Sequence, residues 1–294
     1  MMSIALHTAT EELSLVLFTT LAPSGAAAII AIALVLLLGK LDGAERGRII
    51  TYLWVPLVLT MVGLVASATH LGNPANALYV FSRVGASPLS TEVFTAVLFL
   101  GTVAAYWLHS FARRPRPRLQ RALLAAAVVT GLVFLASVAL AYAVDTIIGW
   151  DTVFVPWGTL ANALVGGPPI ALLTFCVAGA DGCATRWQKP LLALSTVALA
   201  ANIALLAAQN AGLSAIGNSF ATVADLVPFY GALIAAFGVL AACGIGGFWS
   251  FALRRRLPGT ATAALLVALV LAGIFAVRFG FYLMHLTAGM GLSL

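Results

Sequence analysis

The chain has 294 residues, of which 62% are hydrophobic and only 8% are charged, and its formal net charge is +6. A soluble domain usually carries about 25% charged residues. The composition therefore excludes a water-soluble fold and indicates that most of the protein surface faces lipid. The positive charge is explained by its distribution among loops, described below, and does not point to nucleic acid.

A membrane-spanning helix needs about 20 consecutive apolar residues. Backbone groups in hydrocarbon must be hydrogen-bonded within the segment, and these runs lack the alternation of barrel strands. The sequence thus predicts an all-α integral membrane protein with eight transmembrane helices in a single domain, residues 1–294. Two four-helix bundles, roughly residues 1–150 and 151–294, are the alternative. The predicted spans are Leu13–Leu38, Ile49–His70, Thr91–Phe111, Leu119–Val144, Phe154–Ala180, Pro190–Gln209, Leu226–Phe251 and Ala261–Leu286.

Several residues are typical of helix boundaries. Gly72 and Pro74 follow the second span as stop signals. Ser90 and Asp225 are predicted N-caps of the third and seventh spans. The run Gly166–Pro169 predicts a kink in the fifth span.

Basic residues alternate between loops. The loops after the first, third, fifth and seventh spans carry almost all of them, whereas the other loops contain Arg83 and no further Lys or Arg. Positive charge marks cytoplasmic loops. This pattern predicts that both termini lie on the outer, periplasmic side of a bacterial inner membrane. The basic residues of these four loops are Lys40, Arg46, Arg48, Arg113, Arg114, Arg116, Arg118, Arg186, Lys189, Arg254, Arg255 and Arg256.

Polar residues gather at the predicted outer side. His70 ends the second span, Arg83 lies in the outer loop, and Glu92 begins the third span. Arg278 and His285 lie with Tyr282 on one face of the last helix. A helix-dipole interaction for Glu92 or snorkelling for Arg278 is the plain alternative. Together, a His and a carboxylate at one interface indicate proton chemistry on a reduced quinone.

No metal site and no haem are expected in this chain. Cys176, Cys183 and Cys243 match no metal-binding spacing. A buried haem usually needs two axial His ligands, and only His70 and His285 share a side. Both of these residues lie at helix ends rather than at depth, which disfavours a haem.

The blocks HLGNPANAL, RVGASPLSTE, DTIIGWDTVFVPWG, GGPP, DLVPFYGAL and FYLMHLTAGM, in this order, resemble the membrane anchor subunit of dimethyl sulfoxide reductase. That family lies within a wider group of eight-helix quinol-interacting anchors, which includes the polysulfide reductase membrane subunit. The resemblance runs from the second span to the last helix.

The resemblance implies a haem-free subunit that oxidises menaquinol. It further implies two partners, namely an iron–sulfur subunit with four [4Fe–4S] clusters and a catalytic subunit with a molybdopterin cofactor. Within the family, the His and the Glu of the first two blocks are associated with quinol binding, and they correspond to His70 and Glu92. Arg83, Arg278, Tyr230 and His285 are added as candidates on the predicted topology.

Without a cofactor in this chain, electrons must leave close to the quinol, so the iron–sulfur partner is expected to dock on the outer side. Some members of the family are assigned the opposite orientation. The alternatives are an anchor for polysulfide, tetrathionate or formate chemistry, a structural anchor that binds no quinol, and a secondary transporter with a broken fifth span.

Overall fold

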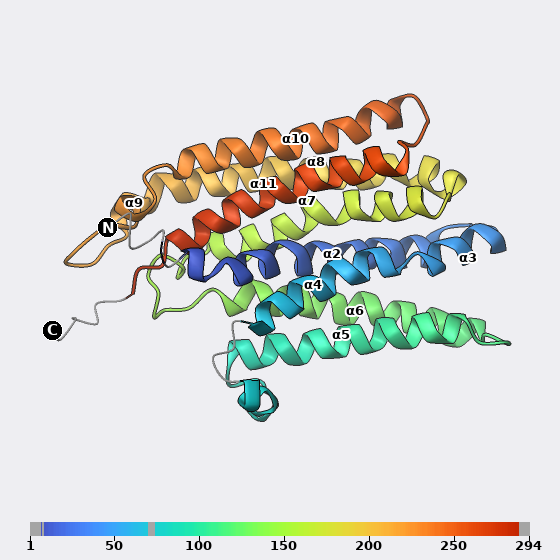
Figure 1. Ribbon diagram of the computed structural model, residues 1–294, viewed down its shortest axis with the longest axis horizontal. Helices are drawn as coiled ribbons and strands as arrows, with labels where there is room; N and C mark the ends of the chain where they lie inside the picture. The colour runs from blue at the N-terminus through green and yellow to red at the C-terminus, as the bar shows by residue number, and fades with distance from the viewer. Residues whose placement is uncertain (1–6, 8, 70–73, 288–294) are drawn as a thin grey trace.

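The computed structural model describes residue 7, residues 9–69 and residues 74–287, with the side chains of residues 74–78 left aside. Eight helices in this part of the chain are long and apolar enough to cross a membrane, which confirms the predicted fold class. Figure 1 shows them running side by side along one long axis. The elements are α2 (Leu13–Leu38), α3 (Gly43–Thr51), α4 (Trp54–Thr69), η1 (Pro74–Arg83), α5 (Pro88–Ser110), α6 (Pro117–Ala141), α7 (Phe154–Val177), α8 (Asp181–Gly212), η2 (Leu213–Ala215), α9 (Val223–Leu226), α10 (Tyr230–Leu253) and α11 (Thr260–Leu283).

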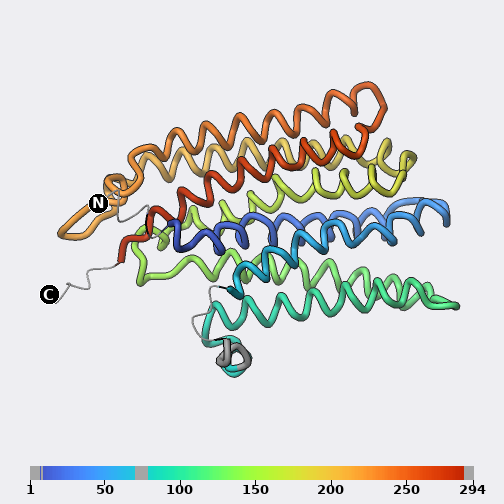
Figure 2. The backbone as a smooth tube through the Cα atoms, in the orientation of Figure 1, coloured from blue at the N-terminus to red at the C-terminus, as the bar shows by residue number. Residues whose placement is uncertain are grey.

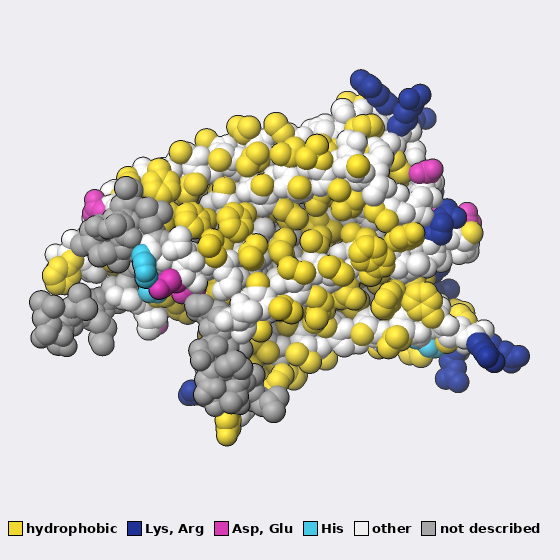
Figure 3. Space-filling model, in the orientation of Figure 1, with side chains coloured by type: hydrophobic (Ala, Val, Ile, Leu, Met, Phe, Trp, Pro, Cys, Tyr) yellow, Lys and Arg dark blue, Asp and Glu magenta, His cyan; other side chains and the backbone are white. Residues whose placement is uncertain are grey.

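The two ends of the bundle differ in charge. One end carries the loops after α2, α5, α7 and α10, and Lys and Arg side chains cluster there (Figure 3). We call it the basic end. The other end carries the start of α2 and the end of α11 (Figure 2), together with the loops after α4, α6 and α8. We call it the termini end. Hydrophobic side chains cover the length between the two ends.

Helices α2 and α7 form the centre of the bundle. In their apolar windows 78% of the residues are buried, against 28% in α5 and α10. Helix α2 packs on α4, α6, α7 and α11, so it contacts helices of both halves of the chain. A Cβ atom on Gly167 would lie 2.6 Å from the Ala27 Cβ. Such close approach of two helices requires small residues and fixes their relative position.

Helix α7 is α-helical throughout, although it contains Pro168 and Pro169. Proline has no N–H, so Pro169 leaves the carbonyl of Val165 without its usual partner within the helix. The Ser195 hydroxyl of α8 donates to that carbonyl at 2.7 Å. A neighbouring helix thus satisfies the group that the proline frees.

Ser195 belongs to a row of buried polar residues on α8. Gln188, Ser195, Asn202 and Gln209 recur at every seventh position, and all four are buried. The Asn202 amide donates to Asn162 Oδ1 of α7 at 2.7 Å. Such bonds between helices in a membrane hold the register of the pair.

Several predicted boundaries were wrong. The second span is divided into α3 and α4 near Pro56, which cannot donate a backbone hydrogen bond in the first turn of α4. Helix α8 begins at Asp181, before the predicted start at Pro190, because its first turns are polar and extend beyond the apolar run. The third span is capped by Ser87, whose side chain accepts from Ser90 N, rather than by Ser90 itself.

Asp225 does not cap the seventh span. It lies in the short helix α9, in a capping box with Thr222, and α10 begins later, at Tyr230. Pro228 separates the two helices. The predicted stop signal at Gly72 lies outside the described residues.

Candidate functional site

The termini end holds the predicted site residues that the structure describes. Glu92 lies in the second turn of α5, Arg278 lies five residues before the end of α11, and Tyr230 begins α10. His285 follows α11 and is half-buried. His70 lies outside the described residues.

Arg278 is a buried cation, with 3% of its surface exposed. Its Nε donates to Thr19 Oγ1 of α2 at 3.0 Å, and its Nη1 donates to Thr159 Oγ1 of α7 at 3.3 Å. Its Nη2 is buried and has no hydrogen-bond partner in the described part of the protein. The predicted alternative of snorkelling is therefore wrong, because the guanidinium points into the bundle between α2 and α7.

Aromatic rings surround the same guanidinium. Its central carbon lies 4.2 Å from the ring centre of Phe281, 5.5 Å from that of Tyr142 and 5.7 Å from that of Tyr282. Aromatic faces attract cations, and the attraction is stronger away from water. The Tyr282 hydroxyl lies beside Thr19, Tyr142 and Arg278, yet it meets the geometry of a hydrogen bond with no described residue.

Trp150 extends this aromatic group to the end of the bundle. Its ring stacks on Phe281 at 4.7 Å between centres, and its Nε1 donates to the Phe281 carbonyl at 3.0 Å. The imidazole of His285 lies edge-on to the Trp150 ring, 5.2 Å between centres. His285 is thereby placed in the same aromatic group as Arg278, one layer closer to the end of the bundle.

Glu92 is 2% exposed, and its Oε2 has no hydrogen-bond partner among the residues described. Its carboxyl group is within electrostatic range of the Tyr142 hydroxyl. Neither Arg83 nor Arg278 forms an ion pair with it within the described ranges, where the one ion pair joins His7 and Glu11. A buried carboxyl group without a partner is costly, and in membranes such groups are usually functional.

We call the buried polar residues around Arg278 and Glu92 the polar cluster. On its α8–α10 side lie Tyr230 and Gln209. The Tyr230 hydroxyl donates to Gln209 Oε1 at 3.3 Å, and the Gln209 amide faces the Met284 sulfur at 3.8 Å. A Cβ on Gly280 would lie 3.1 Å from the Tyr230 ring, so this glycine lets α11 approach Tyr230 closely. Tyr230 therefore belongs to the wall of the polar cluster.

Arg83, in contrast, is exposed at the end of η1 and is not brought into this cluster. Asp145 is exposed as well. Asp225 is exposed and holds its own capping box, where hydrogen bonds from the Thr222 backbone and hydroxyl lower the pKa of its carboxyl group. Asp225 thus belongs to the capping box of α9 and is not the predicted N-cap of the seventh span.

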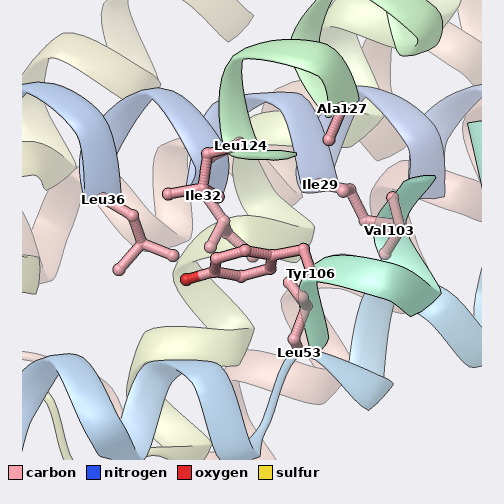
Figure 4. Close-up of a pocket in the computed structure, with 9 residues that line it drawn as sticks. Ile29, Ile32, Leu36, Leu53, Val103, Tyr106, Leu124 and Ala127 are labelled. Atoms are coloured by element: carbon pink, nitrogen blue, oxygen red, sulfur yellow. The ribbon is translucent and has the colours of Figure 1, made fainter. Parts of the chain in front are cut away.

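Two cavities of the described protein lie away from the buried polar residues around Arg278. Figure 4 shows an apolar cavity of about 10 Å³ around Tyr106, Leu36 and Leu124, towards the basic end. That volume is about the size of one water molecule. A larger groove of about 500 Å³ lies on the outside of α5 and α6, with Phe81 and Phe94 at one end. It is open and apolar, as expected of a surface that lipid chains cover.

Sequence reasoning missed the residues that hold Arg278 in place. Thr19, which is followed by Thr20, and Thr159 lie in apolar runs, and nothing in their spacing distinguishes them from other threonines. Tyr142 and Trp150 lie in or beside a loop, where aromatic residues are typical of a membrane interface. Within the described residues, no group of three or more His, Cys, Asp or Glu side chains is placed to hold a metal ion.

Comparison with known proteins gives a consistent result over almost the whole chain. The family model described as "DMSO reductase anchor subunit (DmsC)" matches residues 6–284. The chain is 32% identical to the C subunit of the anaerobic dimethyl sulfoxide reductase of Escherichia coli (strain K12) over 285 residues, covering 96% of this chain and 98% of that protein. It is 28% identical to the C subunit of the Haemophilus influenzae enzyme of the same name, covering 97% and 99% of the two proteins. With eight apolar helices and matches of this extent, the chain is a multi-pass membrane protein and belongs to the family of dimethyl sulfoxide reductase anchor subunits.

Proposed function

We propose that this anchor subunit takes menaquinol from the bilayer at the termini end, oxidises it and passes the electrons to an iron–sulfur subunit. The observation that carries the proposal is the buried, unpartnered carboxyl group of Glu92, which lies at the same end as the buried Arg278. Ionisable groups at this depth are expensive and usually mark a path for protons or substrate. Membership of this family supports the proposal that the chain assembles with the other subunits of such a complex.

The proposed orientation follows the distribution of charge. The basic end faces the cytoplasm of a bacterial cell and the termini end faces the periplasm, in agreement with the positive-inside rule. The bacterial relatives support an inner-membrane location. A reporter active in only one compartment, fused to either terminus, tests the orientation, and activity in the cytoplasm would contradict it.

The residues have the following proposed roles. His70 hydrogen-bonds one quinol hydroxyl and accepts its proton, because an imidazole titrates near neutral pH. Glu92 relays protons to the outer aqueous phase. Arg278 favours the charged form of Glu92, while Tyr230 and His285 line the site.

The reaction balances across the complex. Two O–H bonds of menaquinol break, two protons pass to the side chains and then to water, and a quinone with two carbonyl groups remains. The two electrons would be accepted by the [4Fe–4S] clusters that the partner supplies, and these would pass them to the molybdopterin of the catalytic subunit. Because the chain contributes no electron carrier of its own in this proposal, the iron–sulfur subunit docks at the termini end.

The test uses the assembled complex in membranes. His70→Ala and Glu92→Gln are expected to lower menaquinol-dependent reduction of the terminal substrate at least roughly tenfold, as for loss of a proton acceptor. Turnover with a reduced viologen dye, which feeds the soluble subunits directly, should stay unchanged and reports assembly. Full menaquinol-dependent turnover in both variants would remove these residues from the mechanism.

The anchor alternatives differ in their partners rather than in this chain. Co-purification of iron–sulfur and molybdenum subunits supports an anchor, and the oxidised substrate that the purified complex reduces separates dimethyl sulfoxide from polysulfide or tetrathionate chemistry. A formate complex would instead deliver electrons to quinone. The secondary transporter alternative rests on a kinked fifth span, and α7 carries Pro168 and Pro169 inside one continuous helix. Stabilisation of the isolated protein by a solute would favour that alternative.

A further inference from the structure

We infer that Arg278 binds a quinol oxygen directly as that oxygen becomes anionic, and that Thr19 and Thr159 are positioning residues that aim the guanidinium. The inference rests on the proposed function, since it names the group that meets the negative charge within that site. It replaces an indirect role for Arg278, acting through Glu92, with a direct contact. It also adds two residues, one on α2 and one on α7, to the site.

The first argument is the charge of Arg278. A guanidinium stays protonated in proteins, so this side chain is a permanent cation inside the bundle. Its neighbours are two hydroxyl groups and three aromatic rings, all of them neutral. No carboxylate of the described residues forms an ion pair with it. A buried charge without a counter-charge is costly, so the site favours a partner that brings negative charge.

The second argument is the direction of the two threonine hydroxyls. Thr19 Oγ1 donates its proton to the Leu15 carbonyl at 2.8 Å, and Thr159 Oγ1 donates to the Val155 carbonyl at 2.9 Å. A hydroxyl has one proton to donate and two lone pairs that accept. Because both protons are already used within their own helices, both oxygens present lone pairs to Arg278. The threonines therefore act as fixed acceptors.

The third argument is the part of the Arg278 guanidinium that stays without a hydrogen-bond partner. With Nε and Nη1 engaged, the buried Nη2 has no acceptor among the described residues. The Tyr282 hydroxyl lies close to Arg278, Thr19 and Tyr142 but outside hydrogen-bonding geometry with these described side chains. Arg278 and Tyr282 come from neighbouring turns of α11. Two polar groups with free hydrogen-bonding capacity, enclosed by Tyr142 and Phe281, suit an oxygen on a flat ring.

The fourth argument is rigidity. The threonines lie on the two most buried helices, α2 and α7, which touch through small residues. A Cβ on Gly166 would lie 2.5 Å from Ser24 Oγ, so the two helices have no room to slide past each other. Thr19 and Thr159 are thus held at a fixed separation. A guanidinium that is clamped in advance loses little freedom when it binds its ligand.

The experiment measures quinol kinetics in the assembled complex. Thr19→Val with Thr159→Val removes both acceptors at nearly constant volume, whereas Thr19→Ser with Thr159→Ser keeps them. We expect the valine pair to raise KM for menaquinol roughly tenfold, the loss of about one charge-assisted hydrogen bond, with normal viologen-dependent turnover. The serine pair should restore KM. Thr174→Val is the matched control, because Thr174 is equally buried and bonds only to its own helix.

A second measurement tests the charge. A hydroxynaphthoquinone that is an anion at neutral pH should lose more affinity in the valine pair than a neutral methyl-naphthoquinone does. Unchanged KM together with unchanged affinity for the anion would overturn the inference. If His70→Ala and Glu92→Gln still abolish quinol turnover in that case, the proposed function survives alone. If those variants are fully active as well, the proposed function fails with it.

Discussion

At the basic end the charged side chains of Arg48 and Glu45 are bound to backbone groups, whereas at the termini end Arg278 and Glu92 are buried and partly unpartnered. Arg48 donates to the carbonyls of Ala178 and Gly179, and Glu45 accepts from the Cys183 backbone N–H. These contacts tie α3 to the connection between α7 and α8 and to the first turn of α8. Arg278 and Glu92, in contrast, each keep a polar atom without a partner in the described structure. In the proposed function, the charges at the basic end serve topology and stability, and the buried charges at the termini end serve the chemistry.

The contrast between the basic end and the termini end is tested most directly by replacing one arginine at each end. Arg278→Met should lower menaquinol-dependent turnover by roughly 10- to 100-fold, the effect of losing a buried hydrogen bond from a charged group. Arg114→Met at the exposed basic end should leave it unchanged. Turnover of the complex in membranes is the measurement, normalised to viologen-dependent activity. Equal losses in both variants would mean that the two ends do not differ in role.

A smaller effect is expected when one carboxyl group at each end is replaced. Glu45→Leu leaves the Cys183 N–H in the first turn of α8 without its acceptor, which should destabilise the fold by about 1–2 kcal/mol. Glu11→Leu removes an exposed pair with His7, where a surface ion pair contributes little. Thermal unfolding of the detergent-solubilised complex measures both. A larger shift for Glu11→Leu would contradict the assignment of Glu45 as a structural brace.

The smallest effect concerns pH. The pKa of Asp225 is lowered in the folded protein by hydrogen bonds from Thr222, so its carboxylate contributes stability above its unfolded pKa. That contribution is lost as pH falls below about 4, the ordinary range for an aspartate. Hydrogen exchange at the amides of α9 should therefore rise between about pH 5 and about pH 3 in the native protein, beyond the intrinsic pH dependence of exchange. Asp225→Asn should exchange faster throughout, and its excess should not depend on pH.

The fold could be predicted because the physics of a bilayer leaves few choices. Runs as long as Leu13–Leu38 have to be helices, and the basic loops place alternate connections at the same end. Boundaries such as Asp181 escaped prediction because a helix continues past the apolar run when its first turns reach the interface. The sequence predicted that the sixth span begins at Pro190, but α8 continues through this proline, which lies inside the helix.

The site could be predicted only where a residue is conspicuous by itself. Arg278 and Glu92 are charged groups in or beside apolar runs, so their depth alone marks them. Thr19 and Thr159 become functional candidates only through contacts between helices, and a single sequence carries no signal for such contacts. Arg83 was grouped with the site by its place in the chain, but it lies exposed at the end of η1.

The bond between Arg278 and Thr19 joins residues 259 positions apart in the chain. During synthesis the first spanning helix enters the bilayer long before the last one is made. Until α11 is made, no guanidinium donates to the Thr19 hydroxyl. The central helices α2 and α7 then also lack their contacts with α11. A chain that ends before α11 would therefore lack Arg278 and its bond to Thr19, so in the proposed function the site is complete only when the last helix has been made.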